Sequence, residues 1–226
     1  MVVLALAPSR AAATLCSAAA TLDTFVALGG TGCTVDSSAN SFILKDFAFT
    51  VVSSSGITPA TAADITVALA TPSNFINLSF TSSKFTVSGT QSLSYRIDYT
   101  IDPRPVILIE IDSAMFTSTP VAPGTADSTV NICSGAAFSG AVCPGAGTAY
   151  STHTFHYGTS SGLTNLARFA TPVNVVGIRA GIDLKANGST SSITGIGVNT
   201  MTLPEPASWL MLTSALALFA RRAVLR

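Results

Sequence analysis

The stretch Ser92–Asp102, SLSYRIDYTID, decides the fold class. Large apolar or aromatic residues occupy every second position, and polar or charged residues stand between them. A period of two is typical of a strand with one buried face, because successive side chains of a strand point to opposite sides. The sequence predicts a strand whose core-facing residues are Leu93, Tyr95, Ile97, Tyr99 and Ile101.

Similar runs on both sides of this stretch bring the prediction to roughly ten strands. The clearest are 65–69, 76–80, 107–111 and 178–184. Clusters of Gly, Pro, Asn and Ser separate the runs, and Asn187-Gly188 is typical of a hairpin turn. Short strands at regular spacing predict an all-β fold, an antiparallel, jelly-roll-like β-sandwich. We place it at residues 21–200, with a linker of four to eight residues before Pro204 and a single hydrophobic helix at the C-terminus.

The composition excludes several classes of protein. Of the 226 residues, 48% are apolar and only 10% are charged, whereas charged residues make up about 25% of an average protein. Intrinsic disorder needs low hydrophobicity and high net charge, so a disordered chain is excluded. Seven basic and ten acidic residues between Thr21 and Thr200 give this body a net charge of −3. A weakly acidic body without a basic patch predicts no nucleic-acid partner.

The N-terminal residues 1–20 are predicted to be an atypical signal peptide. They are rich in small apolar residues and end in Ala18-Ala19-Ala20, a pattern typical of a cleavage site. Arg10 interrupts the apolar stretch and no basic region precedes it, so a buried helix of the domain is the alternative. Cleavage after Ala20 would remove Cys16 and leave Cys33 without a partner.

A second pair of cysteines, Cys133 and Cys143, flanks a segment of Gly, Ser and Ala. A short flexible loop closes easily, so we predict a disulfide here in an oxidising compartment, with free thiols as the alternative.

The C-terminal stretch LPEPASWLMLTSALALFARRAVLR has three parts, and residues 201–226 are predicted to form a sorting tail. Pro204-Glu205-Pro206 breaks the chain, because proline cannot continue a strand ladder. An apolar run then ends in arginines, and this order predicts a transmembrane helix at about 207–224 with the body outside the cell. The run is short for a stable span of ~20 residues. The predicted membrane anchor and stop comprise Trp209, Leu210, Leu212, Leu216, Leu218, Phe219, Arg221 and Arg222.

This three-part tail resembles the PEP-CTERM sorting signal of Gram-negative bacteria, a motif also labelled ice-binding protein C-terminal domain. The resemblance covers Leu203 to the end of the chain. It implies export, recognition by an exosortase in the inner membrane, removal of the tail and delivery to the cell surface or extracellular matrix. An ordinary anchor helix that is never cut is the alternative.

The body offers few groups for chemistry. The densest carboxylates are Asp98, Asp102, Glu110 and Asp112, which would converge if their two strands paired across residues 103–105. Such a cluster would suit calcium, which prefers carboxylate oxygens, or a glycosidase-like acid pair. We favour the simpler interpretation of solvated strand faces with Arg96 and Arg104 as counter-ions, and predict no metal site.

The two histidines, His153 and His156, are three positions apart. On a strand this spacing sends them to opposite faces, so a shared metal is not expected. We predict no catalytic residue and no cofactor. The expected function is an exported protein associated with extracellular polysaccharide, and a carbohydrate-binding or carbohydrate-active jelly-roll protein is the alternative.

Overall fold

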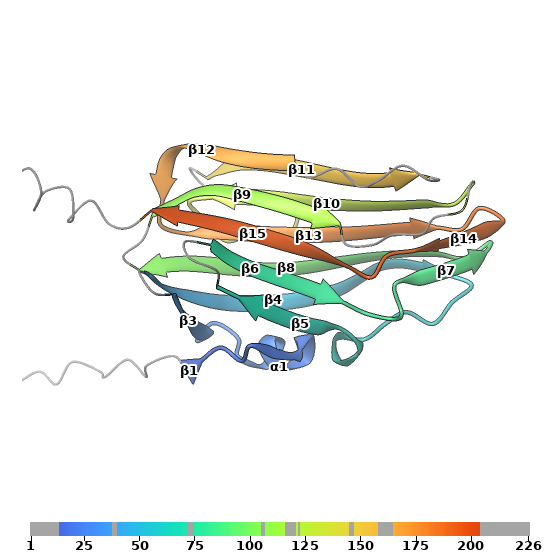
Figure 1. Ribbon diagram of the computed structural model, residues 1–226, viewed down its shortest axis with the longest axis horizontal. Coiled ribbons are helices and arrows are strands. Elements are labelled where there is room, and N and C mark those ends of the chain that lie inside the picture. The colour runs from blue at the N-terminus through green and yellow to red at the C-terminus, as the bar shows by residue number, and fades with distance from the viewer. Residues whose placement is uncertain are drawn as a thin grey trace, which may run out of the picture.

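The computed structural model describes residues 14–37, 40–71, 75–104, 107–115, 121, 123–144, 147–157 and 165–203. Strands dominate these ranges, and they gather into two large sheets and one small one. Figure 1 shows the strands running along the long axis of the molecule. The predicted all-β class is therefore confirmed.

The seven-stranded sheet is antiparallel except at its edge, where β1 and β3 run parallel. Its longest strand, β4, is interrupted by two register shifts, and residue Asp46 between Lys45 and Ala48 has a positive φ. In spatial order this sheet contains β1 (Thr14–Leu15), β3 (Cys33–Ser37), β4 (Asn40–Ser55), β8 (Ser92–Arg104), β13 (Val176–Lys185), β10 (Thr125–Ser134) and β11 (Thr148–Tyr157).

The six-stranded sheet is antiparallel throughout. In spatial order it contains β12 (Asn165–Val173), β9 (Ile107–Met115), β15 (Gly195–Leu203), β6 (Phe75–Thr81), β5 (Thr66–Ala70) and β2 (Ala19–Thr21). The smaller elements are a two-stranded sheet of β7 (Thr86–Gly89) and β14 (Ser189–Ser192), the helix α1 (Leu22–Ala27) and a single 3₁₀ turn at Ala62–Asp64.

The two large sheets pack face to face around one aromatic-rich core. Tyr99 of β8 lies with its ring 5.8 Å from that of Phe80 of β6, so these two residues join the inner faces of the two sheets. The ring of Phe47 of β4 stacks on the ring of Tyr99, with 5.2 Å between the two ring centroids. This arrangement confirms the predicted β-sandwich.

Strand β8 behaves as its alternation predicts. All five predicted core residues are at most 2% exposed. Their neighbours Ser94, Arg96 and Asp98 lie on the other face and are partly exposed.

The predicted turn at Asn187-Gly188 is present, since both residues have a positive φ (51° and 90°). It does not close a hairpin, however. The preceding strand β13 pairs with β8 and β10, whereas the following strand β14 pairs with β7. The turn therefore sends the chain from one sheet to another.

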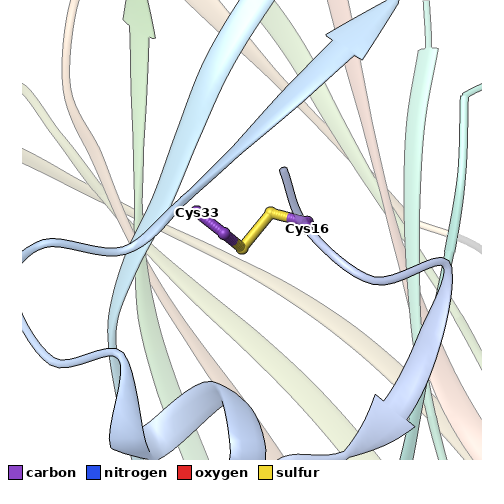
Figure 2. The surroundings of a disulfide bond; sticks show 2 residues. All are labelled: Cys16 and Cys33. Carbon is purple, nitrogen blue, oxygen red and sulfur yellow. A yellow bond between two sulfur atoms is a disulfide. The ribbon is translucent and has the colours of Figure 1, made fainter. Parts of the chain in front are cut away.

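The N-terminal residues Thr14–Ala27 are built into the fold. Strand β2 pairs with β5, and Leu22 and Phe25 of α1 are buried in the core. Cys16 forms a disulfide with Cys33 of β3, as Figure 2 shows. Cys33 thus has a partner in the full chain, and it would lose that partner only if the chain were cleaved after Ala20.

At the other end, β15 continues to Leu203. The strand ends directly before Pro204, so the predicted linker is wrong. The predicted sorting tail and its apolar segment, residues 204–226, lie outside the described residues. Among the residues that are described, no helix is long and apolar enough to cross a bilayer.

Candidate functional site

The outer surface of the seven-stranded sheet gathers most of the charged side chains of its central strands. Register pairs Arg96 of β8 with Thr50 of β4 and with Gly181 of β13, and it pairs Asp98 with Arg179. Residues directly opposite in an antiparallel pair share a face. We call this surface the polar face; it is formed by Lys45, Thr50, Arg96, Asp98, Asp102, Asp127, Thr129, Asn131, Arg179, Gly181 and Asp183.

A two-arginine cluster around Asp98 occupies the centre of the polar face. Arg179 donates from Nε to Oδ1 of Asp98 at 2.8 Å and from an Nη to Oδ2 at 3.1 Å. Its side chain is only 11% exposed, so this bidentate pair is largely shielded from water. Arg96 approaches the same Oδ2 with its Nε at 3.2 Å. The carboxylate of Asp98 therefore forms ion pairs with two guanidinium groups.

The loop after β10, described over residues 135–144, covers one end of the polar face, and the disulfide Cys133–Cys143 closes it. Phe138 in this loop places its ring 4.4 Å from Cζ of Arg179, a cation–π contact, and the carbonyl of Gly140 accepts a hydrogen bond from an Nη of the same arginine. The loop lies close to β13 because residue 177 is glycine. A Cβ there would come within 2.8 Å of the backbone nitrogen of Phe138.

The predicted disulfide between Cys133 and Cys143 is confirmed, with an S–S bond and a Cα–Cα distance of 5.3 Å. Together with Cys16–Cys33 it uses all four cysteines of the chain.

The four carboxylates grouped by the sequence separate in the structure. Strands β8 and β9 do not pair: β8 lies between β4 and β13, and β9 lies between β12 and β15 of the other sheet. Asp98 and Asp102 share the polar face as predicted, but Glu110 and Asp112 belong to the six-stranded sheet. The hairpin on which a shared calcium or glycosidase-like site would have depended is absent, because β8 and β9 belong to different sheets.

Asp102 has a cationic partner of its own. Nζ of Lys45 lies 2.9 Å from its Oδ2, and the carboxylate side chain is only 12% exposed. Arg96, predicted as a counter-ion, does contact Asp98. No group of three or more His, Cys, Asp or Glu suited to a metal occurs among the described residues.

The register of β11 separates the two histidines. His153 pairs with Thr129 and His156 with Ala126, and these partners lie on opposite faces of β10.

A small apolar pocket of about 190 Å³ lies beside the Cys16–Cys33 disulfide. Its lining includes Leu15, Phe25 and Leu28, and Leu15 is 70% exposed. The pocket lies among the elements β1, α1 and β3, and none of its lining residues belongs to the polar face.

The sequence reasoning missed Arg179 and Phe138, which complete the cluster around Asp98. Arg179 interrupts the apolar run of β13 at an alternate position, and this signal was available. Phe138 lies in a loop without periodicity, and nothing local connects it to a strand residue 41 positions away.

Comparison with known proteins finds similar solved structures but no family. No family model matches the chain, and no curated protein matches it. Among solved structures, the chain is similar to TmCBM61, a carbohydrate-binding module solved in complex with β-1,4-galactotriose, with a TM-score of 0.35 and 9% identity over 70% of this chain and 88% of that one. It is also similar to the enzymatically active domain of tailspike protein 4 of bacteriophage CBA120, with a TM-score of 0.28 and 10% identity over 69% of this chain and 19% of that one. At such low scores, neither ligand nor activity is carried over to this chain.

Proposed function

We propose that this protein is an exported, non-enzymatic β-sandwich that associates with extracellular polysaccharide at the cell surface. The observation that carries the proposal is the use of all four cysteines in two disulfides. Disulfides persist in oxidising compartments outside the cytosol.

The route to the surface follows from the C-terminal motif. In this proposal Pro204-Glu205-Pro206 and the apolar, arginine-ended segment after it form a PEP-CTERM signal, which an exosortase recognises at the inner membrane. The position of the motif in the sequence supports this assignment, because Pro204 follows directly on Leu203, the last residue of the last strand.

The polar face is the surface that we assign to polysaccharide. Polysaccharides present hydroxyl groups and apolar ring faces, and proteins bind them with hydrogen-bonding side chains held on rigid elements. The central strands of the sheet supply such groups, and the disulfide-closed loop adds Phe138 beside them. The two sheets exchange strands repeatedly along the chain, for example from β8 to β9 and back to β10. This exchange supports a jelly-roll-like connection as the finer description of the sandwich.

The sorting half of the proposal is tested with the full chain expressed in a Gram-negative host with an exosortase and in the same host without it. We expect a surface or extracellular product whose intact mass lacks Arg226 only when the exosortase is present. Changing Pro204 and Pro206 to alanine should block the processing. A product that keeps Arg226 in both hosts would leave the alternative of a permanent anchor.

The binding half is tested by affinity electrophoresis of the disulfide-bonded protein through gels that contain a panel of neutral and acidic polysaccharides. Retardation by at least one polysaccharide is expected, and it should be reduced by Asn131→Ala on the polar face but not by Asn77→Ala on the outer face of the other sheet. Unchanged mobility in every gel would remove the association with polysaccharide.

A further inference from the structure

Arg96 is a partly exposed cation of the polar face whose hydrogen bonds are poorly formed. Arg179 donates three hydrogen bonds, to the two oxygens of Asp98 and to the carbonyl of Gly140, and its side chain is only 11% exposed. Arg96 reaches only an oxygen that Arg179 already uses, at 3.2 Å, and its buried Nε has no hydrogen bond in proper geometry. Its second contact, from an Nη to Oγ1 of Thr50, is long at 3.5 Å. The other Nη group has no hydrogen bond to any described residue.

The charges at this point do not cancel. Two guanidinium groups and the single carboxylate of Asp98 leave a local charge of +1. Lys45 and Asp102, further along the same face, neutralise each other. Asp183 of β13 lies diagonally from Arg96 in the strand register, but it forms no ion pair with Arg96. The polar face also contains Asp127 and Asp183, which lie opposite each other on β10 and β13, so the excess positive charge is confined to the two arginines around Asp98.

The surface beside Arg96 is open. One third of the Arg96 side chain is exposed. The residue paired with Arg96 on β13 is Gly181, which has no side chain. The residue paired with Gly181 on the following strand, β10, is Thr129. A Cβ added at Gly181 would meet nothing closer than 3.6 Å. A flat ring can therefore approach the sheet over Gly181 between the arginine and a threonine hydroxyl.

We propose that Arg96 binds an oxyanion carried by the polysaccharide, a carboxylate or sulfate on a sugar ring that lies over Gly181. A guanidinium group presents its donors in a planar fork that matches two oxygens of one anion. Asp98 and Thr50 contact the guanidinium group of Arg96 within the sheet, and its exposed Nη edge faces the ligand. This inference rests on the proposed association of the polar face with polysaccharide and adds the chemical class of the ligand.

The test compares three probes: polygalacturonate, the same polymer after its carboxyl groups have been reduced to alcohols, and dextran sulfate. Binding of the full, disulfide-bonded protein is measured by affinity electrophoresis or calorimetry at low salt. Arg96→Gln removes the donor fork. Lys84→Gln is the matched control, because it removes one positive charge from a lysine that pairs with Asp64 away from the polar face.

Gly181→Val is a second variant that leaves every charge in place. Its β-branched side chain suits a strand and has room against the backbone, but it covers the surface over which the ring would lie. Thermal unfolding of each variant verifies that the fold is intact. Gly181→Val thus tests the site even if Arg96→Gln proves unstable.

We expect at least one anionic probe to bind, and both Arg96→Gln and Gly181→Val to weaken that binding roughly tenfold, the loss typical of one charged hydrogen-bonded contact. Lys84→Gln should leave it unchanged. The probe that binds identifies the group as carboxylate or sulfate. Equal binding of polygalacturonate and its reduced form, unaffected by Arg96→Gln, would overturn the inference while leaving the proposed function intact. Binding of no probe, neutral or anionic, would overturn both.

Discussion

Two buried tyrosines on β8 differ in what their hydroxyl groups contact. The hydroxyl of Tyr95 accepts a hydrogen bond of 2.7 Å from the backbone N–H of Ala60. The hydroxyl of Tyr99 lies in the aromatic core without a hydrogen-bond partner among the described residues. Burial raises the pKa of both phenols. A buried polar group without a partner costs free energy, whereas a paired one does not.

Removing each hydroxyl should therefore have opposite effects. We expect Tyr99→Phe to leave the free energy of unfolding unchanged or to raise it by up to about 1 kcal/mol. Tyr95→Phe should lower it by about 1–2 kcal/mol, because the N–H of Ala60 would lose its acceptor. Urea unfolding of the two variants measures this difference, and equal losses in both would show that Tyr99 has a partner.

Asp64 supplies a pH-dependent contribution at the 3₁₀ turn. The hydrogen bond to Lys84 and those from the backbone and side chain of Thr61 lower the pKa of this carboxyl from 3.8 to about 2. Since the pKa is lower in the folded state than in the unfolded one, the carboxylate stabilises the fold above pH 4. The contribution is lost as the pH falls from about 4 to 2.

Replacing Asp64 with asparagine should remove this dependence. We expect the difference in urea midpoint between the wild type and Asp64→Asn to be present at pH 5 and to shrink between pH 4 and pH 2. Asp36→Asn, at an exposed site on β3, is the control. A difference that stays constant down to pH 2 would mean that the turn does not depend on the charge of Asp64.

At the scale of elements, the loop over the polar face depends on Gly177. A Cβ at this position would lie 2.8–3.0 Å from backbone atoms of residues 136–138, and the backbone cannot yield as a flexible side chain could. Gly181, four residues along the same strand, has ordinary van der Waals distances around its missing Cβ. The two glycines of β13 thus differ in what they permit.

We expect Gly177→Ala to destabilise the protein by roughly 1–3 kcal/mol, as overpacking does, and to displace the loop that carries Phe138. Gly181→Ala should be neutral or stabilising by up to about 1 kcal/mol, because glycine is unfavourable within a strand. Chemical unfolding gives the two energies, and hydrogen exchange at residues 136–140 reports the loop. Similar losses in both variants would refute the role given to the loop contact.

The strands themselves were largely predictable, and their partners were not. Alternation in β8 reports which face is buried, so its core residues are those that the sequence predicts. Alternation says nothing of which strand lies alongside, and the chain crosses to the other sheet after Arg104 instead of turning back. The cluster around Asp98 depends on pairing with β13, some 80 residues later. For this reason the sequence placed Asp98 and Asp102 on one face but assigned them the wrong companions.

At the scale of the whole molecule, the N-terminal segment is held to the sandwich by both covalent and hydrogen bonds. The Cys16–Cys33 disulfide spans 17 residues, and Figure 2 shows it joining the segment before β2 to strand β3. The backbone adds bonds of 2.8 Å from Cys16 to Thr34 and from Leu69 to Ala18. Cleavage after Ala20 would remove the disulfide and most of β2.

We therefore expect the folded, exported protein to retain Cys16, with any processing upstream of it. Closing a loop of this length stabilises by roughly 3 kcal/mol in the chain-entropy account. The double variant Cys16→Ser, Cys33→Ser should lose about that amount. A chain that begins at Thr21 should lose more, because the pairing of β2 with β5 goes as well. The double variant Cys133→Ser, Cys143→Ser serves as a control for the loss of a disulfide without loss of a strand.

Urea unfolding of the full chain and of these three altered proteins, together with the intact mass of the exported product, separates the possibilities. If the segment is structural, stability decreases in the order full chain, Cys16→Ser/Cys33→Ser variant, truncated chain, and the exported mass includes Cys16 in an oxidised pair. If the truncated chain is as stable as the full one and the exported product begins at Thr21, then β1 and β2 contribute nothing to the mature fold. The stability of this segment matters for the polar face as well. Cys33 belongs to β3, which pairs with β4, and β4 contains Thr50, a hydrogen-bond partner of Arg96.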